Sequence, residues 1–214
     1  MKVRTETQLF DLIDAELIWR KKELTQFKFL LEDAAKREDR RTALLRSATT
    51  LLYAHWEGFI KEAGSAYLEF VAAQRLRYEE LSPPFLALAA RKMLSEISAS
   101  RRIHSHLAIT TFFRSGLSQT SAIPYKDGIN TRSNLSSTVL REITDSLGLD
   151  FSPYETKCRL IDDTLLTLRN TIAHGQYLPV TQERYEELSK EILAMMEVFR
   201  TQVQNAAVLK QYRL

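Results

Sequence analysis

The chain has 214 residues, with 30 Lys and Arg against 27 Asp and Glu and a formal net charge of +3 at pH 7. This length supports one sizeable core and a single domain over residues 1–214, and the charge permits nucleic-acid contact without the basicity of strong non-specific DNA binders. A single cysteine, Cys158, excludes an internal disulfide framework and fits a reducing compartment. Residues 1–6 lack the apolar run of a signal peptide, and no long uncharged apolar stretch follows. We therefore expect a cytoplasmic protein without a membrane partner.

The composition predicts an all-α fold. Only six glycines and five prolines occur, while Leu, Ala, Glu, Lys and Arg are abundant. We expect an up-and-down bundle of at least five helices. The first predicted helix covers residues 7–35, where apolar side chains recur every three or four positions. Arg20 interrupts this stripe, which indicates a point where the helix meets solvent, a partner or an acidic residue.

The second predicted helix covers residues 41–77. Gly58 and Gly64 inside it each cost about 1 kcal/mol relative to alanine, so close packing against another helix is their expected reason. His55 lies among apolar residues on the same face and is interpreted as a core histidine. Ser82-Pro83-Pro84 then predicts the start of a helix over residues 85–97.

Residues 98–134 form the least regular part of the sequence and are interpreted as an insertion, with a short helix over residues 107–114. Loops of this length in compact domains usually have a function. Two interpretations stay open here, a mobile loop and a segment that guides a substrate. The cations that would contact a nucleic-acid substrate such as RNA are Arg101, Arg102, Arg114, Lys126 and Arg132. His104 and His106 have no third ligand nearby, so we expect no metal site.

Three further helices are delimited by their end signals. Asn134 is expected to cap a helix over residues 135–147, which Gly148 ends. Ser152 and Pro153 predict the start of a helix that runs to His174, since Gly175 fits the left-handed position just past a helix end. The last helix is predicted over residues 181–208.

The helix ending at His174 carries an unusual group of polar side chains. At about 100° per residue, one apolar stripe contains Ile161, Leu165, Leu168 and Ile172. Asn170 and His174 project from the opposite side together with Asp163, and Arg169 lies on the flank about a quarter-turn from the stripe. The ordinary interpretation is a solvated helix end with a cation near the negative pole of the helix dipole. However, an apolar patch beside Arg169, formed by Leu166 and Ala173, indicates a second packed surface that we interpret as a subunit interface.

Arg169-Asn170-x-x-x-His174 resembles the Arg–(Asn/Asp/His)–x–x–x–His signature of the HEPN superfamily, all-helical domains found in prokaryotic toxins and defence effectors. Three further segments resemble one bacterial HEPN subfamily of about this length, namely residues 52–61, 161–166 and 172–175. The resemblance covers most of the chain and is weakest over residues 101–134. It implies a homodimeric RNA endonuclease of a toxin or antiviral system, with an antitoxin or regulatory protein encoded nearby.

The resemblance also implies the site. Arg169, Asn170 and His174 would be catalytic, with Glu57 and Asp163 in support. Glu57 would face the Arg169 cluster and hold the guanidinium in a bidentate fork, or it is an ordinary surface glutamate. In family members that are silenced by nucleotidyl transfer, the modified tyrosine lies two residues after the histidine. Here Tyr177 lies three residues after His174, so this regulation is not expected.

These residue types suit RNA cleavage. Arginine can bind two oxygens of a phosphodiester, and histidine can take a proton from a ribose 2′-hydroxyl or give one to the leaving 5′-oxygen. No metal or other cofactor is needed, and RNA is the expected substrate because DNA lacks the nucleophile. Two alternatives stay open: an inactive HEPN bundle that binds RNA, a nucleotide or a protein partner, and a regulatory subunit whose cluster binds phosphate without cleavage.

Overall fold

The computed structural model describes residues 3–34, 36–98 and 103–214. The helices in these ranges are α1 (Glu6–Asp33), α2 (Glu38–Ala73), α3 (Pro83–Ser98), α4 (Ile103–Thr111), α5 (Ser137–Leu147), α6 (Ser152–Glu155), α7 (Thr167–Ala173) and α8 (Gln182–Val208). A 3-10 turn, η1 (Tyr78–Glu80), and two π-helical segments, η2 (Phe112–Gly116) and η3 (Leu160–Leu166), complete them. The part of the chain that the structure describes has no β-strand, only isolated bridges. The predicted all-α bundle is confirmed.

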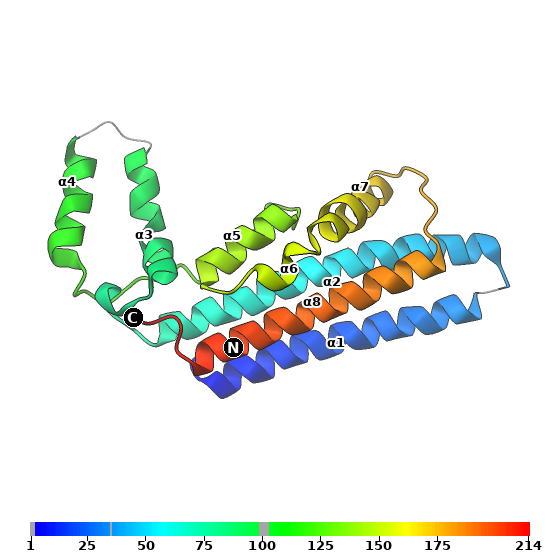
Figure 1. Cartoon of the computed structure of the whole chain (residues 1–214), viewed down its shortest axis with the longest axis horizontal. Coiled ribbons are helices and arrows are strands. Elements are labelled where there is room, and N and C mark those ends of the chain that lie inside the picture. Colours follow the sequence, from blue (N-terminus) through cyan, green and yellow to red (C-terminus); the bar gives the residue numbers. More distant parts are fainter. Residues whose placement is uncertain (1–2, 35, 99–102) are drawn as a thin grey trace.

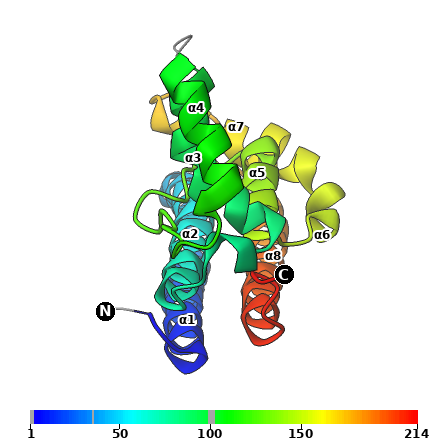
Figure 2. The same cartoon turned by 90° about the vertical axis from the view of Figure 1, so that its left-hand side faces the viewer.

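Three long helices form the body of the molecule. α1, α2 and α8 lie side by side, with α1 antiparallel to the other two, and α5 and α7 pack on α2 (Figure 1). α3 and α4 form a hairpin that projects from the end of the bundle where both chain termini lie (Figures 1 and 2). No helix among the described residues is both long and apolar enough to span a membrane.

The spacing of apolar residues explains this arrangement. The buried face of α1 repeats every three or four residues through Leu9, Ile13 and Leu17, as predicted. α2 has neighbours on several sides, so large aromatic side chains such as Tyr53 and Trp56 are almost completely buried along it. Gly64 is needed for close packing, because a Cβ atom there would lie 3.2 Å from the Ile129 side chain, which belongs to a loop and not to the expected helix.

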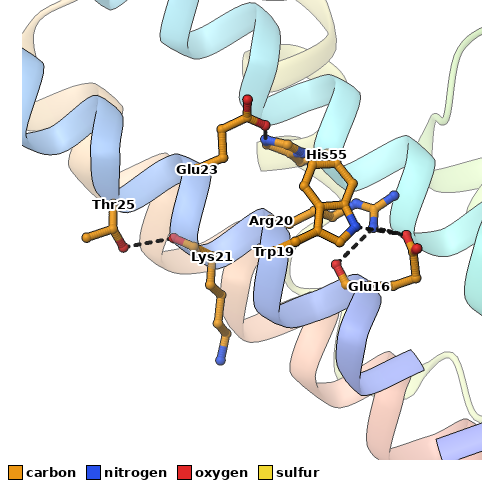
Figure 3. A network of polar contacts seen from close by, with 7 residues as sticks. All are labelled: Glu16, Trp19, Arg20, Lys21, Glu23, Thr25 and His55. Atoms are coloured by element: carbon orange, nitrogen blue, oxygen red, sulfur yellow. Dashed lines mark hydrogen bonds and ion pairs between the residues drawn. The ribbon is translucent and has the colours of Figure 1, made fainter. Parts of the chain in front are cut away.

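Buried polar side chains join α1 to α2 (Figure 3). Arg20 is only 4% exposed, forms an ion pair with Glu16 and lies 4.3 Å over the Trp19 ring, so an acidic residue is its partner among the three alternatives. His55 is buried, as predicted, with Nε2 2.9 Å from Glu23 Oε2. Burial lowers the pKa of His55 and Arg20 lowers it further, while Glu23 opposes both.

The structure corrects two predicted helix starts. Asn134 does not cap α5; the cap is Ser136, whose Oγ accepts from the Val139 amide at 3.3 Å. Gly148 ends this helix at φ 65°, as predicted. Ser152 does not cap α6 either, because its own amide donates to Asp150 Oδ1 at 2.8 Å. An Asp or Asn side chain commonly accepts from the amide two residues later and so forms a turn. At the start of α6 the accepting side chain is therefore Asp150, two residues earlier than predicted.

The segment over residues 98–134 is more helical than predicted. α4 and η2 together cover residues 103–116, whereas the sequence indicated a helix only over 107–114. The large apolar side chains Ile103 and Leu107 of α4 are exposed, so this helix has no amphipathic period from which its start could be read. Residues 117–136 are irregular, apart from turns and the isolated bridge between Thr120 and Arg77.

Candidate functional site

The helix predicted over residues 152–174 is broken, and the break positions the Arg-Asn-His motif. α6 is a single turn, and η3 then continues as a π-helix directly into α7. A π-helical turn holds an extra residue, so it rotates everything after it relative to a regular α-helix. Ile161 and Leu165 are fully buried, but Leu168 is only partly buried. Ile172 also packs against the core, so the four residues of the predicted stripe face inward, and Arg169 is half-buried beside them.

Arg169 contacts its neighbour Asn170 and two distant parts of the chain. Its Nη1 donates to Asn170 Oδ1 at 2.7 Å and to Asn134 Oδ1 at 3.0 Å. Its Cζ lies 4.8 Å from the centroid of the Tyr53 ring on α2, which is within the range of a cation–π contact. The guanidinium is therefore half-buried and fixed in orientation by two neutral amide oxygens and one aromatic face.

Tyr53 contacts both Arg169 and the loop that carries Asn134. Its side chain is 1% exposed, and its hydroxyl accepts from the Leu135 amide at 2.6 Å. Burial raises the pKa of Tyr53 to about 12; Glu57 raises it too, whereas the Leu135 amide and Arg169 oppose the rise. Tyr53 stays protonated near neutral pH and is a structural contact, not a general base.

His174 lies at the exposed end of α7. Its amide donates to the Asn170 carbonyl at 3.0 Å, and its side chain faces solvent. Gly175 has φ 77°, so it ends the helix as predicted. Arg46 on α2 donates to the Gln176 carbonyl at 2.9 Å, which ties the segment after His174 to the body of the bundle.

An open groove borders the same end of α7. It has a volume of about 770 Å³ and lies between α1, α2 and α7, with Phe27, Leu51, Ile172 and Ala173 among its lining residues. Ala173 is exposed, as expected for the predicted interface patch. Leu166 is not part of such a patch, because it packs against the core of its own chain.

Comparison with protein families decides the membership of the chain. The RiboL-PSP-HEPN family model matches residues 15–205. The chain belongs to this family. Comparisons with curated proteins and with solved structures gave no match. Membership of a HEPN family indicates RNA cleavage or nucleotide binding as the class of function, and the matched range includes the motif together with Tyr53 and Asn134.

Glu57 and Asp163 were predicted to support Arg169 in this RiboL-PSP-HEPN chain, and the structure shows a different arrangement. Within the described residues, Arg169 and Glu57 form no ion pair. Glu57 is half-buried one turn after Tyr53, and its charge helps to raise the pKa of that tyrosine. The bidentate fork is therefore wrong. Asp163 is exposed, whereas its neighbour Asp162 accepts from the Ser137 amide at 2.7 Å and from the Ser137 hydroxyl.

The predicted RNA-contacting cations are spread over several places. Arg101 and Arg102 lie outside the described residues. Arg114 is exposed on η2, which continues α4, and Figure 1 shows α4 well away from α7. Arg132 pairs with Glu142 at 2.7 Å, and Lys126 lines an open polar pocket of about 460 Å³ together with Lys61.

Sequence reasoning missed Asn134 and Tyr53 as site residues. Asn134 was assigned to a helix cap, which is the usual role of an asparagine before an apolar run. Tyr53 lies inside the 52–61 segment that carried part of the family resemblance, so a signal was present. What the sequence lacked was the contact between that segment and the motif.

Proposed function

We propose that this RiboL-PSP-HEPN protein is a metal-independent RNA endonuclease that acts as a toxin or antiviral effector. Arg169, Asn170 and His174 are its catalytic residues. The observation that carries the proposal is the fixed guanidinium of Arg169, which takes its orientation from two hydrogen bonds, to Asn134 and to Asn170. Arg169 lies on α7, the short helix that ends at the exposed His174.

Arg169 supplies charge stabilisation. Cleavage of a phosphodiester passes through a transition state with extra negative charge on the phosphate oxygens. A planar guanidinium that is already oriented can contact two of these oxygens without reorganising. Its two amide partners are neutral, so the full positive charge of Arg169 remains for the phosphate.

His174 supplies proton transfer. Its exposed side chain can take the proton of a ribose 2′-hydroxyl, which then attacks the adjacent phosphorus while the bond to the 5′-oxygen breaks. The products are a 2′,3′-cyclic phosphate and a 5′-hydroxyl end, and no step needs a metal. Because one histidine does not easily serve as both base and acid, a second copy of the chain supplies the other.

The homodimer therefore forms a composite site in this proposal. The groove beside Ile172 and Ala173 supports an interface at this end of α7, since it is open and has apolar lining residues next to the motif. A two-fold axis at the groove would bring two Arg169–His174 clusters to one cleft. An antitoxin or regulatory protein encoded nearby would then control this dimer.

One observation favours the alternative of a nucleotide- or RNA-binding module without catalysis. Asn170 accepts from Arg169 at 2.7 Å, so its oxygen orients the guanidinium and not the imidazole of His174. Such a site can bind a phosphate without cleaving its ester.

RNA cleavage in the presence of a chelator separates the two functions. The enzyme should cleave single-stranded or loop RNA under these conditions and inhibit growth when overexpressed, and His174→Ala should remove both effects. RNA binding without cleavage, unchanged by His174→Ala, would support the binding module.

A further inference from the structure

We infer that Asn134 is a positioning residue that orients Arg169 toward the phosphate, and that Tyr53 holds Asn134 in place. This inference deepens the proposed function and rests on it. The contacts that carry it come from the 130–136 loop and from α2, outside the Arg-Asn-His motif itself.

The choice of an amide oxygen is chemically informative. Arg169 Nη1 lies between Asn134 Oδ1 at 3.0 Å and Asn170 Oδ1 at 2.7 Å. A carboxylate at either place would bind the guanidinium more strongly, but it would neutralise the charge and compete with a phosphate. Two amide oxygens fix the direction of Arg169 and leave its charge available to an anionic ligand. A purely structural arginine would gain more from an acidic partner.

Asn134 is itself fixed from two sides. The next amide in the chain, that of Leu135, donates to the Tyr53 hydroxyl at 2.6 Å, and the Ser137 amide donates to Asp162 Oδ1 at 2.7 Å. Tyr53 thus has two contacts that serve one purpose: its hydroxyl holds the loop that carries Asn134, and its ring lies beneath the Arg169 guanidinium. Precise orientation of a catalytic group requires such support from its neighbours.

Two substitutions of Asn134 separate orientation from charge. Asn134→Ala removes the acceptor and should lower kcat by up to about 100-fold, because a misplacement of about 1 Å in a catalytic group can cost that much. Asn134→Asp keeps the acceptor but adds a charge. It should retain more of kcat, raise KM, and reduce the salt dependence of RNA binding by about one phosphate contact.

Asn130→Ala is the matched control. Asn130 lies in the same loop and is exposed, but its Oδ1 accepts from the Arg132 amide at 2.8 Å. This variant should keep the kcat and KM of the wild type. A loss of activity in Asn134→Ala that is matched by Asn130→Ala, or that only follows the fraction of folded protein, would overturn the positioning role.

A second measurement does not depend on activity. Nitrogen-15 NMR of labelled arginine side chains, with the Arg169 signals assigned from the Arg169→Lys variant, reports how freely the guanidinium rotates. Restricted Arg169 signals should be present in the wild type and in Asn130→Ala, and should be averaged in Asn134→Ala. Arg169 signals that stay restricted in Asn134→Ala would overturn the inference. An Asn134→Ala variant with averaged Arg169 signals but the kcat of the wild type would also overturn it. A wild-type protein with restricted Arg169 signals but no cleavage would instead contradict the proposed nuclease.

Discussion

The Arg169 guanidinium lies over the Tyr53 ring, with 4.8 Å between Cζ and the ring centroid. This cation–π contact joins α7 to the middle of α2. This contact joins the Arg-Asn-His motif to the 52–61 segment, and both resemble HEPN proteins. It also makes the orientation of Arg169 a property of the bundle core, because Tyr53 is almost completely buried.

Tyr53→Phe tests the hydroxyl of this contact alone. The ring beneath Arg169 remains, but the buried Leu135 amide loses its acceptor at 2.6 Å. A buried donor without a partner costs about 1–3 kcal/mol, so the free energy of unfolding measured by urea titration should fall by that amount. Tyr177→Phe is the control, since Tyr177 is 74% exposed and its hydroxyl is expected to contribute less than about 0.5 kcal/mol. Equal stabilities of the two variants would contradict this role of the hydroxyl.

Arg169→Lys should abolish most of the cleavage without unfolding the protein. An ammonium cannot make the planar two-point contact with a phosphate, and losing one such contact costs about 3 to 4 kcal/mol in the transition state, or roughly a hundred- to thousand-fold in kcat. Arg141→Lys is a matched control, because Arg141 also stacks on an aromatic ring, that of Phe151, at 3.8 Å. Similar rates for both variants would show that Arg169 does not contact the reacting phosphate.

Ala173→Arg tests the interface. Ala173 is exposed and lines the groove beside the motif, so a large charged side chain should block a second copy from docking while the fold of the single chain is kept. We expect a monomer in sedimentation velocity and loss of cleavage. Val208→Arg changes an exposed apolar residue at the end of α8 and should remain dimeric and active. Full cleavage by monomeric Ala173→Arg would contradict the composite site.

His55→Gln tests the buried histidine between α1 and α2. Burial lowers the pKa of His55 in the folded state, so protonation favours the unfolded chain. The stabilisation by neutral His55 is therefore present above its unfolded pKa of about 6.5 and is lost as the pH falls below that value. Urea titrations at about pH 7.5 and pH 5 should show a larger loss of stability on acidification for the wild type than for His55→Gln. The same loss in both proteins would mean that Glu23 compensates fully for burial.

The fold was predictable where side-chain periodicity is regular. The stripe of Leu9, Ile13 and Leu17 on α1 defines a bundle helix from the sequence alone, and Gly148 marks the end of α5. These features depend on residues close together in the chain. The α3–α4 hairpin was not predicted, because the apolar residues of α4 are exposed and carry no period.

The candidate site was predictable in its residues more than in its geometry. A helical wheel at 100° per residue assumes a regular α-helix, and the π-helical segment before Thr167 breaks that assumption. Arg169 is half-buried beside the predicted stripe, but a wheel of one helix cannot show what it contacts. Its partners Asn134 and Tyr53 come from distant parts of the chain, and only the packing of α5 and α7 on α2 brings them together.

The most direct test of the nuclease is cleavage of an RNA oligonucleotide with a single 2′-deoxy substitution at the mapped cut site, in the presence of a chelator. The all-RNA substrate should be cut there to a 2′,3′-cyclic phosphate and a 5′-hydroxyl, and the substituted substrate should resist cleavage at that position because it lacks the nucleophile. Continued cleavage at the deoxy position would contradict attack by the 2′-hydroxyl and with it the roles given to Arg169 and His174.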